Sequence, residues 1–251
     1  MAAKGKAISR ASPSRIKTSG TKSSRLKSSK TKSALQSARQ YSSCPIVGIG
    51  GSAGGFEAAM ELLRNLPPRT GMAFVIVQHL DPHHGSRLPN LLGKATSMPV
   101  TEITGTTVPK PNTIYVQPPD KCVIAKNGKL TLVQRTERLN LAIDHFFESL
   151  AEECGSRAIG IVLSGTGSDG TAGLRAIKAA GGLTFAQTEA SAKFDAMPRS
   201  AIRSGFVDVV LPPDAIAREI RSISGRRACT QSVTMATAAT ISTTPTTFST
   251  P

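Results

Sequence analysis

Short apolar runs alternate with helically spaced apolar residues along the middle of the chain. The continuous runs predict buried strands at Pro45–Ile49, Met72–Val77, Ala158–Leu163, Leu183–Ala186 and Val207–Leu211. Apolar residues three or four apart predict helices between these runs, at 56–66, 88–95, 143–151, 171–180, around Ser200 and at 214–223. Continuous strands separated by helices are typical of parallel sheets covered on both faces. We therefore expect an α/β fold, with a doubly wound, mainly parallel sheet and helices on both of its faces.

Residues 100–133 show a different pattern, with short runs and a clear turn signal. Strands are predicted there at Thr113–Val116, Cys122–Ala125 and Leu130–Val133. The dipeptide Asn127-Gly128 favours a tight hairpin turn between the last two strands. We expect the three strands to form a small antiparallel insertion beside the main sheet.

The positive charge of the chain is concentrated at its N-terminus. The formal net charge is +15, and residues 1–43 contain eleven of the 31 Lys and Arg residues and no acid. Serine, lysine and alanine dominate this segment, which has too few large apolar residues to offset the entropy of ordering. We predict a disordered basic tail over 1–43, a folded domain over 44–223 and a disordered threonine-rich tail over 224–251.

The basic tail allows several interpretations, which the sequence leaves open. Its charges can act as a solubilising segment, neutralise the phosphates of a nucleic acid, or contact an anionic surface. An arginine- and serine-rich N-terminus without acids also resembles an organelle transit peptide.

The composition argues against secreted, membrane-spanning and zinc-binding proteins. No apolar run approaches the roughly 18 residues of a spanning helix, and the N-terminus lacks the apolar core of a secretory signal. The four cysteines lie far apart and form no CxxC pair, which disfavours a zinc site or a dense disulfide framework. Because this cysteine usage fits a reducing compartment, we predict a cytoplasmic location.

Reactive side chains follow three of the predicted strands. Ser52 lies in a G-x-S-x-G turn after the first strand, His79 follows the second, and Asp169 lies in the glycine-rich turn after 158–163. In parallel sheets, ligands bind beyond the carboxyl ends of the strands, so these three side chains can converge. Ser52 is then the nucleophile, His79 the general base, and Asp169 the group that orients the imidazole. The backbone amides of Ala53 and Gly54, where the next helix begins, are candidates to stabilise an oxyanion.

Each of these signals also has a simpler interpretation. The spacing Gly48-x-Gly50-x-x-Ala53 also fits a dinucleotide-binding fingerprint, and Asp81 is then the candidate ribose ligand. A histidine after a strand is commonly a solvated loop residue. Asp169 is suitably placed to cap the helix that begins near Thr171.

Other polar residues of the domain point less clearly to a site. His83 and His84 lie near Asp81, but adjacent side chains diverge, so we expect no metal site there. His145 lies among apolar residues on a predicted helix and is expected to be structural. Gln187 and Glu189 follow the strand 183–186 and are further candidates to line the crevice, although a polar turn is the simpler interpretation.

Five segments of the domain carry more information together than singly. They are Pro45–Gly55, Val77–Leu80, Leu163–Gly170, Phe185–Thr188 and Ala196–Arg199. In this order they resemble the catalytic domain of chemotaxis protein-glutamate methylesterases, the CheB family, and most closely the domain of methylesterase/methyltransferase hybrids. The resemblance covers most of the domain. It implies that Ser52, His79 and Asp169 are the family's catalytic residues, and it displaces the dinucleotide interpretation.

The resemblance also implies a substrate and partners. It implies hydrolysis of glutamate γ-methyl esters on the cytoplasmic helices of chemoreceptors, with methanol as a product, no cofactor, and deamidation of receptor glutamines as a related activity. We expect the chain to lack the family's usual receiver domain, so a separate receiver or methyltransferase protein is an implied partner. Ala53 and Thr166 stand where many members carry Thr and Met. The alternative is a non-catalytic binding or scaffold domain of a methylation-tuned signalling complex.

Overall fold

A seven-stranded sheet forms the centre of the computed structural model, which describes residues 44–78, 87–134 and 141–225. The strand order is β3-β4-β2-β1-β7-β8-β9, and each neighbouring pair in this sheet is parallel. The strands are β1 (Ile46–Gly51), β2 (Ala73–Gln78), β3 (Val100–Glu102), β4 (Thr113–Val116), β7 (Ile159–Val162), β8 (Leu183–Gln187) and β9 (Val209–Leu211). The predicted fold class is confirmed.

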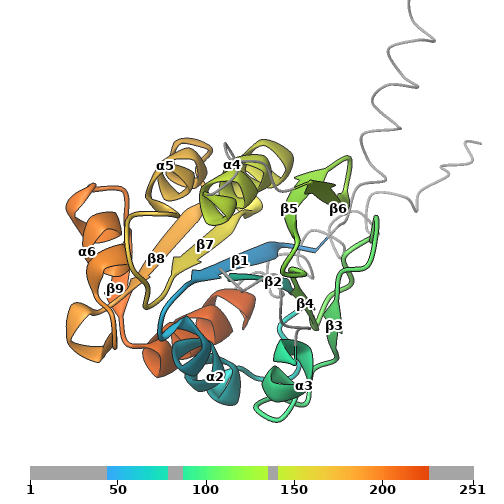
Figure 1. Ribbon diagram of the computed structural model, residues 1–251, viewed down its shortest axis with the longest axis horizontal. Helices are drawn as coiled ribbons and strands as arrows, with labels where there is room; N and C mark the ends of the chain where they lie inside the picture. Colours follow the sequence, from blue (N-terminus) through green and yellow to red (C-terminus); the bar gives the residue numbers. More distant parts are fainter. Residues whose placement is uncertain (1–43, 79–86, 135–140, 226–251) are drawn as a thin grey trace, which may run out of the picture. The chain divides into compact units, whose positions relative to one another are not determined.

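Helices cover both faces of the sheet (Figure 1). They are α2 (Gly55–Asn65), α3 (Leu88–Leu92), α4 (Ala142–Cys154), α5 (Thr171–Ala179), α6 (Ala196–Arg203) and a helix at 213–225, with short 3-10 turns at Gly155–Arg157 and Glu189–Ser191. Residues of α4, α5 and α6 share one apolar core with one face of the sheet. Residues of α2, α3 and the helix at 213–225 form a second core on the opposite face. The sheet is therefore buried on both sides, which explains why its strands are continuous apolar runs.

Two glycines bring α4 close to the central strand. Val47 and Ile49 of β1 pack into the core on the α2 face. Gly48 and Gly50 face the other way, and a Cβ atom on Gly48 would lie 2.7 Å from the ring of Phe147. A Cβ on Gly50 would collide with the side chain of Ile143. The missing side chains let the first turns of α4 lie directly over β1, near its carboxyl end.

The predicted insertion is correct only in part. Strands β5 (Lys121–Lys126) and β6 (Lys129–Gln134) form a separate antiparallel hairpin through Asn127 and Gly128, which have φ of 53° and 70°. However, Thr113–Val116 is not part of this hairpin, because it forms β4 and pairs in parallel with Ala73–Ile76. The prediction was wrong here because a parallel pairing between distant segments leaves no local pattern in the sequence.

The polar residue Asn112 holds β4 beside β2. Its side-chain oxygen accepts hydrogen bonds from the backbone amides of Thr70 and Gly71, at 2.7 and 2.8 Å. Its own amide donates to the carbonyl oxygen of Met72 at 2.7 Å, and its φ is 57°. Asparagine tolerates this left-handed conformation better than most residues do, so it can end the preceding loop and start the strand.

The predicted tails fall almost entirely outside the described residues. The structure describes nothing before Cys44, and the last helix extends to residue 225, two positions past the predicted end of the domain. The domain limits therefore stay a prediction. Within the described residues, no helix combines the length and the apolar character that crossing a membrane requires. Of the three cysteines in this part of the chain, Cys44 and Cys122 are buried and Cys154 is half-buried.

Candidate active site

The carboxyl ends of three adjacent strands, β2, β1 and β7, meet at the middle of the sheet. The chain passes from β1 to β2 in one direction and later crosses back to β7 on the other side of β1. Such a reversal opens a crevice in doubly wound sheets. Ser52 follows β1, and the loop with Asp169 follows β7. His79 follows Gln78 in the chain but lies outside the described residues, as do Asp81, His83 and His84.

Ser52 lies in a tight turn between β1 and α2, as predicted. The carbonyl oxygen of Ser52 accepts a hydrogen bond from the amide of Gly55 at 2.8 Å, which closes the turn. Gly54 is the N-cap of α2 and has a φ of 71°, a value that favours glycine. The side-chain amide of Gln78 donates to the same carbonyl at 3.4 Å, which ties the turn to the end of β2. Ser52 itself is half-buried.

The loop after β7 packs directly against this turn. The amide of Ser52 donates to the carbonyl oxygen of Ser164 at 3.0 Å, which continues the β1–β7 pairing beyond the strands. Gly165 comes next, and a Cβ atom there would lie 3.0 Å from the Cβ of Ser52 and collide with the sulfur of Met197. Only glycine fits between the side chains of Ser52 and Met197, so packing explains the glycine at position 165 in the segment Leu163–Gly170.

Ser164 connects three segments of the site, a role that the sequence analysis did not assign. Its hydroxyl accepts from the amide of Phe194 at 3.0 Å and lies 2.9 and 3.2 Å from the carbonyl oxygens of Ala53 and Phe194. Its amide donates to the side-chain oxygen of Gln187 at 2.8 Å. Ser164 is 1% exposed. The only signal in the sequence is a hydroxyl directly after a buried strand, which is too common to be specific.

Asp169 is buried, with 3% of its surface exposed, and several backbone amides surround its carboxylate. One carboxylate oxygen accepts from the amide of Ile143 at 3.0 Å; the other accepts from Asp144 and Gly170, both at 2.9 Å. Asp169 therefore caps the amino end of α4, not α5 as the simpler interpretation proposed. The amino end of a helix favours a negative charge. The carboxylate is held in one orientation at the carboxyl end of β7.

Asp144 in the first turn of α4 makes the reciprocal contact. Its carboxylate accepts a hydrogen bond from the amide of Gly173, in the first turn of α5, at 2.7 Å. Burial, followed by the nearby charges of Asp169 and Glu148, raises the pKa of Asp144 to about 6, although the bond from Gly173 opposes this rise. An acid in the first turn of a helix is common, so the sequence alone did not single out this residue.

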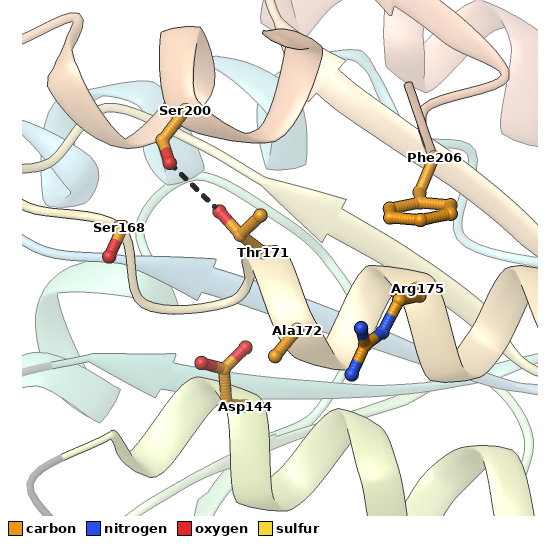
Figure 2. A pocket seen from close by; sticks show the side chains of 7 residues that line it. All are labelled: Asp144, Ser168, Thr171, Ala172, Arg175, Ser200 and Phe206. Atoms are coloured by element: carbon orange, nitrogen blue, oxygen red, sulfur yellow. Dashed lines mark hydrogen bonds between the residues drawn. The ribbon is translucent and has the colours of Figure 1, made fainter. Parts of the chain in front are cut away.

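A pocket of about 350 Å³ adjoins the loop that contains Asp169 (Figure 2). Figure 2 shows Asp144 rising from α4 toward α5, with Ser168 on the loop and Arg175 on α5. On the α6 side, the hydroxyl groups of Thr171 and Ser200 are hydrogen-bonded at 3.2 Å. Asp144 lines this pocket, although only 7% of its surface is exposed.

The remaining candidate residues from the sequence are Gln187, Glu189 and His145. Gln187 is 1% exposed, and its side-chain amide group joins the amide of Ser164 to the carbonyl of Ser191, so it braces loops and does not line a crevice. Glu189 is exposed in a 3-10 turn, and His145 is half-buried on α4. Among the described residues, no three His, Cys, Asp or Glu side chains are grouped to hold a metal ion.

Comparison with known proteins agrees with this geometry. Residues 47–220 match the family described as CheB methylesterase. The chain belongs to the CheB methylesterase family. The resemblance expected from the five segments is thereby confirmed. The crystal structure of the CheB methylesterase catalytic domain of Thermotoga maritima superimposes with a TM-score of 0.67 at 30% identity, covering 72% of this chain and 99% of that one.

Two relatives share different portions of their length with this chain. A protein of Photorhabdus laumondii named protein-glutamate methylesterase/protein-glutamine glutaminase is 36% identical over 176 residues, which cover 68% of this chain and 50% of that protein. An uncharacterized 104.1 kDa protein of Rhodobacter capsulatus is 42% identical over 141 residues, which cover 56% of this chain and 15% of that protein. The chain thus spans half or less of the length of these relatives.

Proposed function

We propose that this chain is a protein-glutamate methylesterase that hydrolyses glutamate γ-methyl esters with Ser52 as nucleophile. The observation that carries the proposal is the junction of the two loops after β1 and β7. The amide of Ser52 is bonded to Ser164, and the buried Asp169 lies five residues further along the same loop. Membership of the CheB methylesterase family supports the same chemistry.

His79 completes the proposed triad. Gln78 pairs in register with Gly51 at the ends of β2 and β1; in the sequence, His79 follows Gln78 and Ser52 follows Gly51. This register supports a proton transfer from the Ser52 hydroxyl to the imidazole. The carboxylate of Asp169 then orients the imidazole and stabilises its protonated form.

The proposed reaction has two halves. In the first, the Ser52 oxygen attacks the ester carbonyl and His79 takes its proton; the tetrahedral intermediate expels methanol, which leaves with that proton. The backbone amides of Ala53 and Gly54, at the amino end of α2, are the proposed donors to the oxyanion. In the second half, His79 activates water, which hydrolyses the acyl-enzyme and releases the glutamate carboxylate. No cofactor takes part in these steps.

The proposed substrates are methylated glutamates on the cytoplasmic helices of chemoreceptor-like proteins, and the proposed location is the cytoplasm. Deamidation of glutamine is a proposed second activity, because the same attack on an amide carbonyl expels ammonia in place of methanol. The name of the Photorhabdus relative includes both activities. A separate receiver or methyltransferase protein is a proposed partner.

Methanol release from methylated chemoreceptor cytoplasmic fragments tests the proposal directly. The full chain is compared with Ser52→Ala, and labelling of Ser52 by a fluorophosphonate is followed in parallel. We expect steady methanol release and stoichiometric labelling of the unaltered chain, and neither for the variant. Because Ser52 is a turn residue between two elements, circular dichroism of Ser52→Ala is expected to be unchanged.

Each alternative result has a definite meaning. Equal methanol release by a folded Ser52→Ala variant would contradict the serine mechanism. Labelling of Ser52 without methanol release would point to a different ester substrate or to a missing activator. If Ser52 is not labelled and no methanol is released, the proposal is overturned in favour of a non-catalytic scaffold domain.

A further inference from the structure

The two helices next to the proposed catalytic loop cap one another. Asp169, which precedes α5, accepts the amides of Ile143 and Asp144 in the first turn of α4. Asp144 in turn accepts the amide of Gly173 in the first turn of α5. A buried carboxylate on α4 thus satisfies a backbone amide at the amino end of α5, and a buried carboxylate in the loop before α5 satisfies amides at the amino end of α4.

The crossing point of these helices is unusually close. A Cβ atom on Gly173 would lie 3.1 Å from both the Cα and the carbonyl oxygen of Asp144, and it would collide with the Cβ of Phe147. The backbones of α4 and α5 therefore approach each other at Asp144. The Asp144–Gly173 hydrogen bond lies in the first turn of α5, and Asp169 comes directly before Gly170, the N-cap of that helix.

We propose that Asp144 is a positioning residue for Asp169, and that its carboxylate holds the start of α5 so that the carboxylate of Asp169 keeps its orientation. This inference rests on the proposed function, because it assigns Asp144 a part in the same triad. Asp144 does not touch the reacting atoms. It acts through two hydrogen bonds: its side chain accepts from Gly173 and its backbone amide donates to Asp169.

Three variants separate positioning from general stability. Asp144→Ala removes the acceptor for Gly173. Asp144→Asn keeps an oxygen acceptor of the same reach. The matched control is Asp208→Ala, because Asp208 also binds a backbone amide and a hydroxyl, both from Thr184, and forms an ion pair with Lys178. Thr184 lies near the amino-terminal end of β8, whereas Ser52 follows the carboxyl end of β1, which is parallel to it in the sheet.

The readouts are the rate constant for fluorophosphonate labelling of Ser52 and the separate values of kcat and KM for methanol release. Because small displacements of a catalytic group lower rates strongly, we expect Asp144→Ala to lower kcat and the labelling rate about 10- to 100-fold. We expect KM to change by less than about twofold. Asp144→Asn should restore both rates to within about threefold of the unaltered chain, since the hydrogen bond alone orients α5.

Urea denaturation shows that each variant is folded under the assay conditions. The Asp208→Ala control is expected to lose stability with kcat unchanged. If Asp144→Ala does not fold, Asp144→Ser, which keeps a shorter acceptor, is measured in its place. We then expect Asp144→Ser to lower kcat and Asp144→Asn to keep it near that of the unaltered chain.

The outcomes distinguish the inference from the proposed function. If Ser52 of the unaltered chain reacts but Asp144→Ala reacts equally fast, the positioning role is overturned and the triad stands. If Asp144→Ala and Asp208→Ala lower kcat alike, the effect of Asp144 is only on stability, and the inference is again overturned. If Ser52 of the unaltered chain is inert, the proposed function fails and the positioning role fails with it.

Discussion

The hydroxyl of Ser164 lies 2.9 Å from the carbonyl oxygen of Ala53, which joins the loop after β7 to the turn that presents Ser52. The same hydroxyl accepts the amide of Phe194, so one buried side chain connects the ends of β1 and β7 with the segment before α6. The turn that contains Ser52 and the loop that contains Asp169 are therefore parts of one hydrogen-bonded unit.

Replacement of Ser164 by alanine is expected to damage both stability and activity. Ser164→Ala leaves the amide of Phe194 without its acceptor and the carbonyl of Ala53 without a donor, in a nearly water-free place. We expect the free energy of unfolding to fall by about 1–3 kcal/mol and kcat to fall about tenfold as the turn moves. Urea denaturation and methanol release measure the two effects.

Ser149→Ala is the matched control for this substitution. The hydroxyl of Ser149 also links two segments, because it accepts from the amide of Ala125 in β5 and donates to the carbonyl of Phe146. We expect the Ser149→Ala substitution to lower the free energy of unfolding with little effect on kcat. A Ser164→Ala variant that keeps full kcat would show that the position of the turn does not depend on this hydroxyl.

Replacement of Asp169 by asparagine tests the proposed role of its charge. An amide group cannot stabilise the protonated imidazole, and it presents its NH₂ group either to the amides of α4 or to His79. We expect Asp169→Asn to lower kcat by about 10³- to 10⁴-fold, as replacement of the acid does in Ser-His-Asp triads. A kcat within a few-fold of the unaltered chain would show that Asp169 serves only as a cap of α4.

The raised pKa of Asp144 predicts a particular pH dependence of stability. The pKa is about 6 in the folded protein and 3.8 is the reference value, so the folded state binds a proton more tightly than the unfolded state. The stabilisation from this group is complete below pH 3.8 and is lost as the pH rises through about 6. The charged groups around it are Asp169 on the loop, Glu148 on α4 and Arg175 on the α5 wall of the pocket.

Asp144→Asn removes this titration and isolates its effect. We expect the variant to gain stability relative to the unaltered chain between pH 4.5 and pH 7.5, because only the unaltered chain must bury a charge at the higher pH. Urea denaturation of both proteins at several pH values measures the difference. Parallel stability curves across this range would contradict the raised pKa.

Deletion of residues 1–43 tests whether the basic segment acts apart from the site. Its eleven positive charges without acids predict salt-sensitive binding to polyanions, since neutralising phosphates releases counterions. We expect the deletion to leave kcat and KM unchanged and to abolish binding to duplex DNA at 50 mM salt. A large change in kcat would instead mean that the segment regulates the proposed active site.

Much of the architecture could be predicted because it is local. The buried strands of the sheet are continuous apolar runs, and the turn at Ser52 is marked by small residues on both sides. The strand β4 could not be placed, because its parallel partner β2 is distant in the sequence, and so are the backbone groups that Asn112 binds before that strand. His79 was predicted from its place after β2 and the family resemblance, and its role stays a prediction.

The sequence by itself determined the fold class, the family and the residues Ser52 and Asp169 as candidates, since each depends on short segments with a specific order. Only the tertiary structure decided what surrounds these residues. Asp169 caps α4 through the amides of Ile143 and Asp144, which lie 26 and 25 positions away in the chain. Asp144 and Ser164 gained their roles in the same way. Hydrogen bonds between distant segments depend on how helices and strands pack, and no local pattern of residues encodes that packing.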